Sequence, residues 1–577
     1  MRLGSRASWI GGLAAAAVLA TTAMGTGMVG AASVHRAGPT PGGTIVAALT
    51  AQSNVDWYFP VDNPANQTVP VARIVGMMWE PLLYFNNQNQ LDPSQQLASK
   101  VTYNSQGTVY HVFLNPKWHW SDGTPITSAD AVWSVQAQIA MMQSNAPAPW
   151  PSSSVGSGGL PQDFVSVVAN GPYEFTITIN KPVNQAWFIA NGVGTFAIFP
   201  KHAWDKYPNN MTQEIKYLGQ NATNPNFDSV VSGPFKMLSA IQNQAWTFVP
   251  NPNYSGHKSI VSKFIWQYEA STTAEFAGLK TGAIQIGYLP AEDWAARLEL
   301  PDRMVLAPSL RYSFVWTDMN PGTPGGANTI FQNLYVRQAM AMAMNGNAML
   351  NIIYHGQGTP GYGPFPAVPK TSFSDPVLTK PIYPYDPAKG KALLEAHGWQ
   401  DVNGVMTKGS QQMKYTLQYP SGSIATTEEM ELIQSGLAQE GIQITLEPIP
   451  FSSLVGELGT PSKWQMVGGI SLVYGGGYPS GESLFYENKD LDLNGWNNPE
   501  ENKLIQLTTE PSPSPAVTQQ RMFSYFEYTA KELPAFFLPS IWGDNEVAHN
   551  IGGYNAYTMD SVTDGPLPQY WYVQSGG

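Results

Sequence analysis

Residue types that could catalyse a reaction or hold a metal are scattered along this sequence. Its eight histidines show no ligand spacing, and the closest pair is His111 and His119. We find no His-Glu-x-x-His, no Gly-x-Ser-x-Gly, no phosphate-binding loop and no dinucleotide-binding fingerprint. The absence of cysteine excludes disulfides, thiolate metal sites and thiol nucleophiles. The sequence therefore predicts a protein that performs no chemistry of its own and needs no cofactor.

Length and composition indicate a large folded protein with few charges. The chain has 577 residues, too many for a single hydrophobic core, so we expect two or more domains. Charged residues make up 12%, against roughly 25% in an average globular protein, while 43% are hydrophobic. The net charge is -12 and no basic run occurs, which argues against a nucleic-acid partner. Because few titrating groups limit acid denaturation, we hypothesise an acidic environment, with a bias in composition as the alternative.

The first residues have the pattern of an export signal. Two arginines precede an uncharged, Ala-rich stretch over residues 9–24, and small residues suitable for cleavage follow. We predict a signal peptide over 1–32 and a linker over 33–43, and hence an exported protein at the extracellular face or in the periplasm. An uncleaved membrane anchor is the alternative, because residues 7–34 carry no charge. Without cysteine, a lipid-modified N-terminal cysteine is excluded.

Periodicity and turn chemistry predict a mixed α/β chain without internal repeats. β-branched and aromatic residues favour strands over residues 44–49, 108–114, 174–179 and 442–446. Apolar residues at helical spacing, together with end signals, predict helices over residues 71–78, 128–142, 387–397, 427–440 and 516–533. Thr127 is expected to cap one of these helices, with Asp130 completing a capping box.

The segment over residues 118–132 is far more specific than any of these patterns. It reads Trp-His-Trp-Ser-Asp-Gly-Thr-Pro-Ile-Thr-Ser-Ala-Asp-Ala-Val. It resembles the signature of the extracellular solute-binding proteins of family 5, which serve ABC importers of peptides, nickel and some oligosaccharides. In that family a Trp precedes Ser-Asp-Gly-x-Pro and a helix start of small residues. The segment consists of residues typical of turns and helix caps, so it indicates the fold and does not indicate a binding site.

Further elements that resemble the family occur in the family's order along the chain. Each is short and weak alone, but together they cover nearly the whole sequence after residue 40. They are Leu91-Asp92-Pro93 with Leu97-Ala98, Ser232-Gly233-Pro234-Phe235, Asn251-Pro252-Asn253-Tyr254, Leu279-Lys280-Thr281-Gly282-Ala283-Ile284, Val336-Arg337-Gln338-Ala339, Tyr385-Asp386-Pro387 and Gly552-Gly553-Tyr554.

The resemblance implies an α/β, two-lobed fold of the periplasmic-binding-protein type. It would be of type II, in the large class with an extra subdomain, with mixed sheets and a hinge between the lobes. The first lobe would comprise residues 41–308 and 541–577, with the subdomain over about 76–185. The second lobe would comprise residues 309–540. A solute would bind between the lobes, which close on it.

Candidate ligand-binding residues in the first lobe follow the first predicted strand. Trp57 and Tyr58 come shortly after it, and the resemblance implies that Trp79 and Glu80 lie nearby. Aromatic rings offer flat contact area to sugars, peptide side chains or cations. We predict that these four residues line the cleft, with an ordinary role in the core as the alternative.

Candidate residues in the second lobe are Tyr474, Tyr478 and Glu482. The resemblance implies a position for an Asp that pairs with a peptide's α-ammonium in many members, and Gly477 stands there in this sequence. A buried ammonium without a carboxylate is costly, which makes a standard peptide ligand less favoured. Glu482 could replace that Asp from five residues further on, with a structural role as the alternative.

We therefore predict an extracellular receptor of an ABC importer that captures a peptide or peptide-like polar solute. Its partners would be the solute and the permease subunits in the membrane, and we expect a monomer. An oligosaccharide receptor of the same family is the first alternative. A secreted carbohydrate-active enzyme is the second, because spacing alone does not exclude a pair of catalytic carboxylates.

Overall fold

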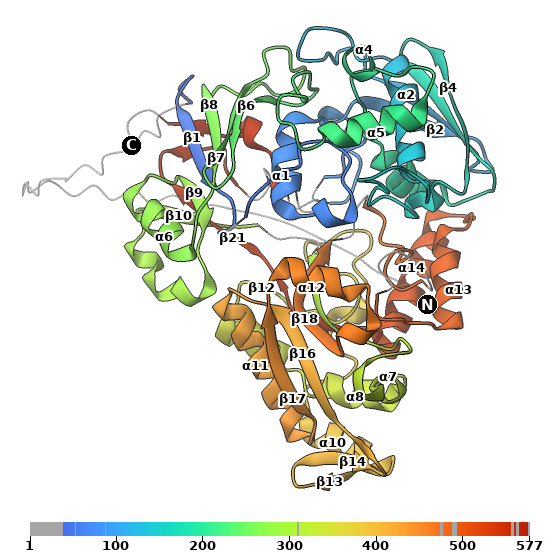
Figure 1. The fold of residues 1–577 in the computed structure, drawn as a ribbon, viewed down its shortest axis with the longest axis vertical. Helices are drawn as coiled ribbons and strands as arrows, with labels where there is room; N and C mark the ends of the chain where they lie inside the picture. The colour runs from blue at the N-terminus through green and yellow to red at the C-terminus, as the bar shows by residue number, and fades with distance from the viewer. Residues whose placement is uncertain are drawn as a thin grey trace, which may run out of the picture. The chain divides into compact units, whose positions relative to one another are not determined.

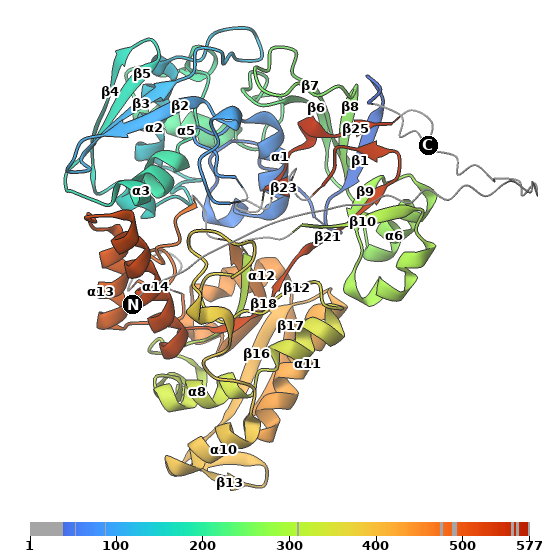
Figure 2. The ribbon, with the colours of Figure 1, turned by 180° about the vertical axis from the view of Figure 1, so that it is seen from behind.

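Two mixed β-sheets organise the fold (Figures 1 and 2). The computed structural model describes residues 39–51, 53–86, 88–307, 311–473, 477–486, 493–555, 559–560 and 565–574. One sheet has seven strands in the order β10-β21-β9-β1-β8-β7-β6, and the other has five in the order β17-β16-β18-β11-β19. We call residues 39–307 with 543–574 the first lobe, and residues 311–541 the second lobe.

The seven-stranded sheet forms the centre of the first lobe. β1 pairs in parallel with β8 and β9, whereas β21 runs antiparallel to β9 and β10. Ile45 and Ala47 on β1 are fully buried, as expected for a strand in the middle of a sheet. The strands of the seven-stranded sheet are β1 (Thr44–Ala48), β6 (Phe235–Ile241), β7 (Ala245–Pro250), β8 (Lys263–Gln267), β9 (Ile286–Tyr288), β10 (Asp302–Ala307) and β21 (Gly543–Ala548).

A second, antiparallel sheet of four strands belongs to the same lobe. Its order is β2-β3-β5-β4, and helix α2 (Ser128–Met141) packs against it. The strands are β2 (Ala98–Tyr103), β3 (Val109–Leu114), β4 (Phe164–Gly171) and β5 (Glu174–Ile179).

The five-stranded sheet forms the centre of the second lobe. β16 runs parallel to β17 and β18, and β11 runs antiparallel to β18 and β19. Its strands are β11 (Arg311–Thr317), β16 (Lys414–Pro420), β17 (Gln443–Ile449), β18 (Met466–Val473) and β19 (Phe536–Leu538). Smaller ladders join β12 (Gly358–Thr359) to β20 (Ser540–Ile541), and β13 (Gln400–Val402) to β14 (Val405–Lys408) and β15 (Gln411–Gln412).

The chain passes from one sheet to the other twice. β10 of the first sheet precedes β11 of the second, and β19 of the second sheet is followed by β20 and then by β21 of the first. Two such crossings are what a hinge between lobes requires. They support the predicted lobes over 41–308 with 541–577 and over 309–540, and the four-stranded sheet supports a subdomain within 76–185. These boundaries stay predictions.

Local end signals explain where the helices begin. Thr127 donates through its N–H and its hydroxyl to Asp130 Oδ2, at 2.9 and 3.0 Å, so α2 begins as predicted. Asp386 accepts from the amide of Lys389 at 3.0 Å, as expected for an N-cap. The helix predicted from residue 427 begins earlier, because Ser423 Oγ accepts from the amide of Thr426 at 3.1 Å.

The remaining helices cover the sheets or join the lobes. α11 packs on β16 and β17 in both ribbon views, and α13 lies beside α14. The longer helices are α1 (Val69–Met78), α5 (Met211–Asn221), α6 (Thr272–Thr281), α8 (Leu334–Met342), α10 (Pro387–Ala396), α11 (Ile424–Gln439), α12 (Phe451–Leu458), α13 (Pro499–Thr509) and α14 (Pro515–Glu532). The short ones are α3 (Gln185–Trp187), α4 (Lys201–Trp204), α7 (Asn328–Phe331) and α9 (Gly346–Ala348).

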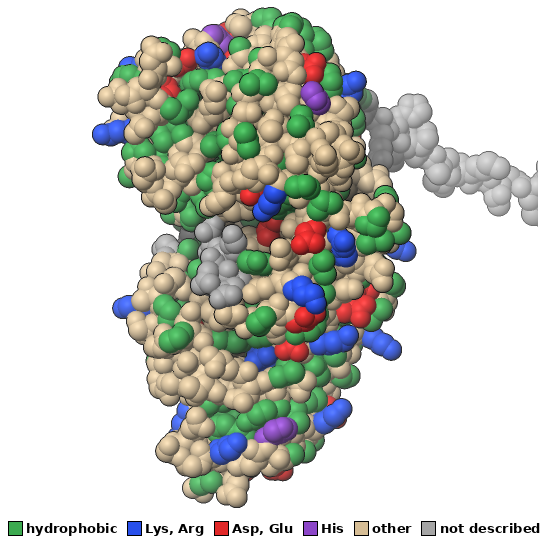
Figure 3. All heavy atoms as spheres, turned by 90° about the vertical axis from the view of Figure 1, so that its right-hand side faces the viewer, with side chains coloured by type: hydrophobic (Ala, Val, Ile, Leu, Met, Phe, Trp, Pro, Cys, Tyr) green, Lys and Arg blue, Asp and Glu red, His purple; other side chains and the backbone are tan. Residues whose placement is uncertain are grey.

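The surface reflects the low charge content of the sequence. On the face in Figure 3, charged side chains are scattered among uncharged side chains and backbone. Within the described ranges, we find no helix with the length and apolar character needed to span a bilayer.

Candidate functional site

The two lobes meet at a segment of the second lobe that carries Glu482. Trp187 Nε1 donates to Glu482 Oε2 at 2.5 Å, and Asn191 Nδ2 donates to Oε1 at 3.2 Å. The amide of Gly158 donates to the same Oε1 at 3.2 Å. All three donors belong to the first lobe, so this carboxylate is bound across the junction.

Asn184 places Trp187 at this junction. Its Oδ1 accepts from the amides of Ala186 and Trp187, at 3.0 and 3.3 Å, and so caps α3. Its Nδ2 donates to Tyr478 Oη and to the carbonyl of Thr508, both at 3.2 Å. One side chain therefore orients the helix that carries Trp187 and also binds the second lobe.

Tyr478 extends the same network. Its hydroxyl donates to the carbonyl of Thr508 at 2.8 Å, and its own carbonyl accepts from Asn191 Nδ2 at 3.0 Å. Burial raises the pKa of Tyr478, which therefore stays a neutral hydroxyl donor. Asn191 thus holds the backbone of Tyr478 and the carboxylate of Glu482 at once.

The environment of Glu482 alters its protonation. Loss of surrounding water raises the pKa of Glu482 to about 7, although the hydrogen bonds from Asn191, Gly158 and Trp187 favour the charged form. The carboxyl at the junction therefore changes charge near neutral pH, well above the range of an exposed glutamate.

Gly477 leaves no room for a side chain. Its φ of +77° lies in the left-handed region, and a Cβ there would stand 2.8 Å from Asn89 Oδ1 and 2.9 Å from the ring of Phe85. Asn89 Nδ2 also donates to the carbonyl of Gly477 at 2.5 Å. Packing between the lobes therefore excludes a carboxylate side chain at position 477.

A second contact between the lobes involves His355, which the sequence analysis did not single out. Its ring stacks on Trp294 with centroids 5.2 Å apart and planes at 12°. Its Nε2 lies 3.1 Å from the carbonyl of Ala291, an acceptor, so Nε2 carries the proton. Ala291 is the first residue of η6 (Ala291–Glu299), which follows β9 and precedes β10 in the chain. In Figure 2 these two strands lie on the opposite side from α3, which carries Trp187.

The predicted residues of the first lobe lie in its core. Trp57 is buried and donates through Nε1 to the carbonyl of Val61 at 3.1 Å, and Tyr58 Oη donates to the carbonyl of Val55 at 3.0 Å. Each of the two therefore directs its polar atom to the backbone of its own lobe.

Trp79 and Glu80 are also buried. Trp79 packs edge-on against Trp204 at 5.2 Å, and Glu80 accepts from Tyr254 Oη at 2.7 Å. Burial raises the pKa of Glu80 to about 7, against the lowering effect of the Tyr254 hydroxyl.

The structure brings Tyr478 and Glu482 together at the junction, and places Trp57, Tyr58, Trp79 and Glu80 inside the first lobe. Tyr474 lies outside the described residues. The ligand-binding role of these seven residues stays a prediction.

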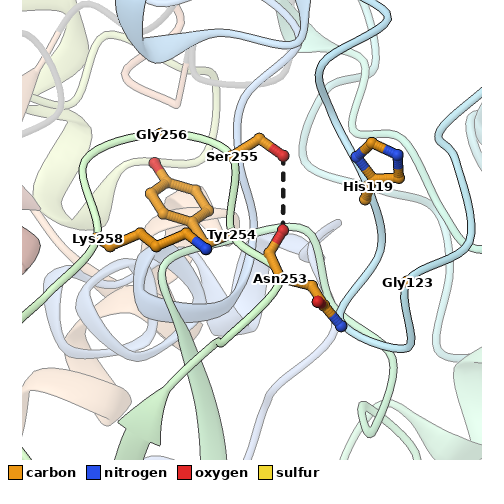
Figure 4. Close-up of a pocket in the computed structure, with 7 residues that line it drawn as sticks. All are labelled: His119, Gly123, Asn253, Tyr254, Ser255, Gly256 and Lys258. Carbon is orange, nitrogen blue, oxygen red and sulfur yellow. Dashed lines mark hydrogen bonds between the residues drawn. The ribbon is translucent and has the colours of Figure 1, made fainter.

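Two pockets lie away from the junction. The larger, about 390 Å³, opens between the loop of His119 and Gly123 and the loop of residues 253–258 (Figure 4). Ser255 Oγ lies 3.5 Å from the carbonyl of Asn253 in its wall. The smaller, about 110 Å³, is lined by residues of the second lobe, among them Tyr362 and Phe536. Each pocket is lined by one lobe, so closure would not enclose a solute in either.

The fold and the junction define a two-lobed solute-binding protein of type II, as the sequence predicted. The model of the bacterial extracellular solute-binding proteins, family 5 (middle region), matches residues 92–491, which is more than half of the chain. The chain belongs to this family, whose members are periplasmic or extracellular binding proteins. The predicted family and fold class are thus confirmed.

Individual proteins of this kind are similar over most of their length. The oligopeptide-binding protein AppA of Bacillus subtilis is 22% identical over 501 residues, which cover 84% of each chain. The structure of AppA from Bacillus subtilis in complex with a nonapeptide has a TM-score of 0.74 at 19% identity, covering 93% of this chain and 100% of that one. NikZ from Campylobacter jejuni in complex with Ni(L-His) has a TM-score of 0.72 at 17% identity, covering 92% and 99%.

Proposed function

We propose that this chain is the receptor of an ABC importer, which captures a peptide or peptide-like polar solute between its lobes and delivers it to the membrane permease. The observation that carries the proposal is the family match over residues 92–491, because that range includes strands of both principal sheets. Peptide-binding names among the relatives, such as the oligopeptide-binding protein AppA, support the class of solute.

The structure supports capture by closure. The lobes are joined by two chain crossings and touch at Glu482 and at His355. A solute held between two such lobes is enclosed when they approach and released when they separate. The proposed work of the chain is therefore binding and docking, without catalysis, and energy for transport comes from the partner ATPase. We also propose an exported monomer without a lipid anchor.

An oligosaccharide or another neutral polar solute is the second candidate. The packing of Phe85 and Asn89 against Gly477 favours it, because no carboxylate can stand there to pair with a peptide's α-ammonium. A peptide ligand would then need its amine to be met by another acceptor or to stay solvated.

Mass spectrometry of small molecules released from protein purified from native cells tests the proposed class of solute. We expect peptides or a related polar solute at one equivalent, and calorimetric titration with that solute should then give one-to-one binding. Recovery of an oligosaccharide would replace the peptide proposal with the second candidate. Turnover of model peptides or glycosides by the purified chain would contradict the binding-only proposal.

A further inference from the structure

We propose that Trp187 and Glu482 form a latch that holds the two lobes together and sets how readily they separate. Trp187 belongs to the first lobe and Glu482 to the second, and their hydrogen bond of 2.5 Å joins residues 295 positions apart in the sequence. The inference rests on the proposed function, because a latch acts only where the lobes open and close.

The donors around Glu482 suit an acceptor that the other lobe presents. In its charged form, Glu482 only accepts hydrogen bonds, and here three N–H groups of Trp187, Asn191 and Gly158 converge on its two oxygens. Hydrogen bonds to a charged acceptor are stronger than those between neutral groups. Separation of the lobes would break all three at once, so their loss opposes opening.

Contacts within the first lobe position its side of the latch. Asn184 fixes the helix of Trp187 through the N-cap, and Ser157 Oγ donates to the carbonyl of Asn191 at 2.8 Å. Gly158 approaches the backbone of Gly192 so closely that a Cβ would stand 2.5 Å from it, which brings the Gly158 amide to Glu482. Pre-positioned donors lose little freedom when the acceptor docks.

This arrangement also changes the expected role of Glu482. Both of its oxygens are engaged by the first lobe, so we infer that Glu482 affects solute capture through closure rather than by pairing with a solute cation. In this role it is a positioning residue.

Similar pairs inside a single lobe provide controls. Three other buried glutamates accept a hydrogen bond from an aromatic side chain of their own lobe: Glu80 from Tyr254 at 2.7 Å, Glu429 from Tyr354 at 2.6 Å, and Glu501 from Trp496 at 2.8 Å. The Trp496–Glu501 pair has the same chemistry as the proposed latch. Because both partners lie in the second lobe, weakening it should not move the lobes.

The absence of cysteine allows a direct measurement of lobe separation. Gln106 in the turn after β2 and Gln411 on β15 are exposed, one in each lobe, and cysteines placed there accept spin labels. Electron–electron distance measurements on the full, solute-free chain at pH 8, where Glu482 is charged, then report the open and closed populations. We expect Trp187→Phe to raise the ratio of open to closed by about tenfold, and Asn191→Ala to raise it in the same direction.

The control separates a latch from general destabilisation. Trp496→Phe removes the same kind of N–H from a carboxylate within one lobe, and should leave the ratio within about twofold of the wild type. An unchanged ratio in Trp187→Phe and Asn191→Ala, with cooperative unfolding retained, would overturn the latch, as would an equal shift in Trp496→Phe. Failure of the proposed function would appear separately, as a wild-type chain that binds no solute.

Discussion

Gly390 on α10 makes room for the carboxylate of Glu440: a Cβ at position 390 would stand 1.8 Å from Glu440 Oε1. Glu440 is fully buried at the end of α11, and no donor among the described residues reaches either of its oxygens. Burial raises the pKa of Glu440 to about 9. The folded protein therefore holds this group as a neutral acid at pH 7.

We predict that Glu440→Gln stabilises the protein at pH 8 by about 3–5 kcal/mol and has little effect at pH 4. Because the folded-state pKa is raised, the stabilising contribution of Glu440 is complete below pH 4.5 and is lost as the pH rises toward 9. Urea unfolding of both proteins at both pH values measures the difference. Glu431→Gln, on the exposed face of the same helix, is the control, and equal effects at the two pH values would contradict the prediction.

Gly477→Ala tests the packing of the junction. Both Gly477 and Gly404 have positive φ, +77° and +82°, but a Cβ at Gly404 meets nothing within 4 Å. We expect Gly477→Ala to lower the free energy of unfolding by about 1–3 kcal/mol more than Gly404→Ala, because only the former drives a side chain into Phe85 and Asn89. Urea denaturation of the two variants gives the difference. Equal losses of unfolding free energy would contradict the prediction, because they would show that position 477 accommodates a side chain.

Buried carboxyl groups with raised pKa values support the hypothesis of an acidic environment. Burial raises the pKa of Glu80, Glu275, Glu429 and Glu482 to about 7 and that of Glu501 to about 8, and raises the pKa of Asp228 as well. Each of these groups contributes stability that is complete below its unfolded pKa and declines as the pH rises through its folded pKa. Asp401, whose pKa is lowered by its hydrogen bond from Lys391, acts in the opposite direction.

We therefore expect the thermal midpoint to hold or rise as the pH falls from 7 to about 4, where ordinary carboxyl groups begin to be protonated. Scanning calorimetry from pH 7 to pH 3 measures it. A steep fall below about pH 5 would contradict the hypothesis and leave the low charge content without a physical account.

The N-terminal prediction concerns residues outside the described ranges. We expect the protein from native cells to begin near Ala32 or Ser33, because small residues suitable for signal cleavage precede that point. N-terminal sequencing of soluble and membrane fractions distinguishes the alternatives. A start at Met1 in the membrane fraction would show that the segment stays as an anchor.

Local chemistry made part of the fold predictable from the sequence. The start of α2 follows from Thr127 and Asp130, three residues apart, and the motif over residues 118–132 led to the family that the comparison confirmed. The strand over residues 44–49 was predicted from the residue types of one short segment, and β1 occupies residues 44–48.

The junction could not be predicted in the same way. Trp187 and Glu482 are 295 positions apart, and Trp294 and His355 are on different lobes, so no local pattern links them. Glu482 was singled out as a substitute for a missing Asp, a role that stays a prediction, and the structure shows its oxygens bonded to the first lobe. Only the assembled fold brings the donors of Trp187, Asn191 and Gly158 to that carboxylate.

Solution X-ray scattering, with and without the solute identified by mass spectrometry, tests the central claim most directly. A receptor that captures its solute by closing two lobes should show a smaller radius of gyration when the solute is added at saturating concentration, and the thermal midpoint should rise in the same sample. A solute that binds one to one and leaves the scattering curve unchanged would contradict capture by lobe closure.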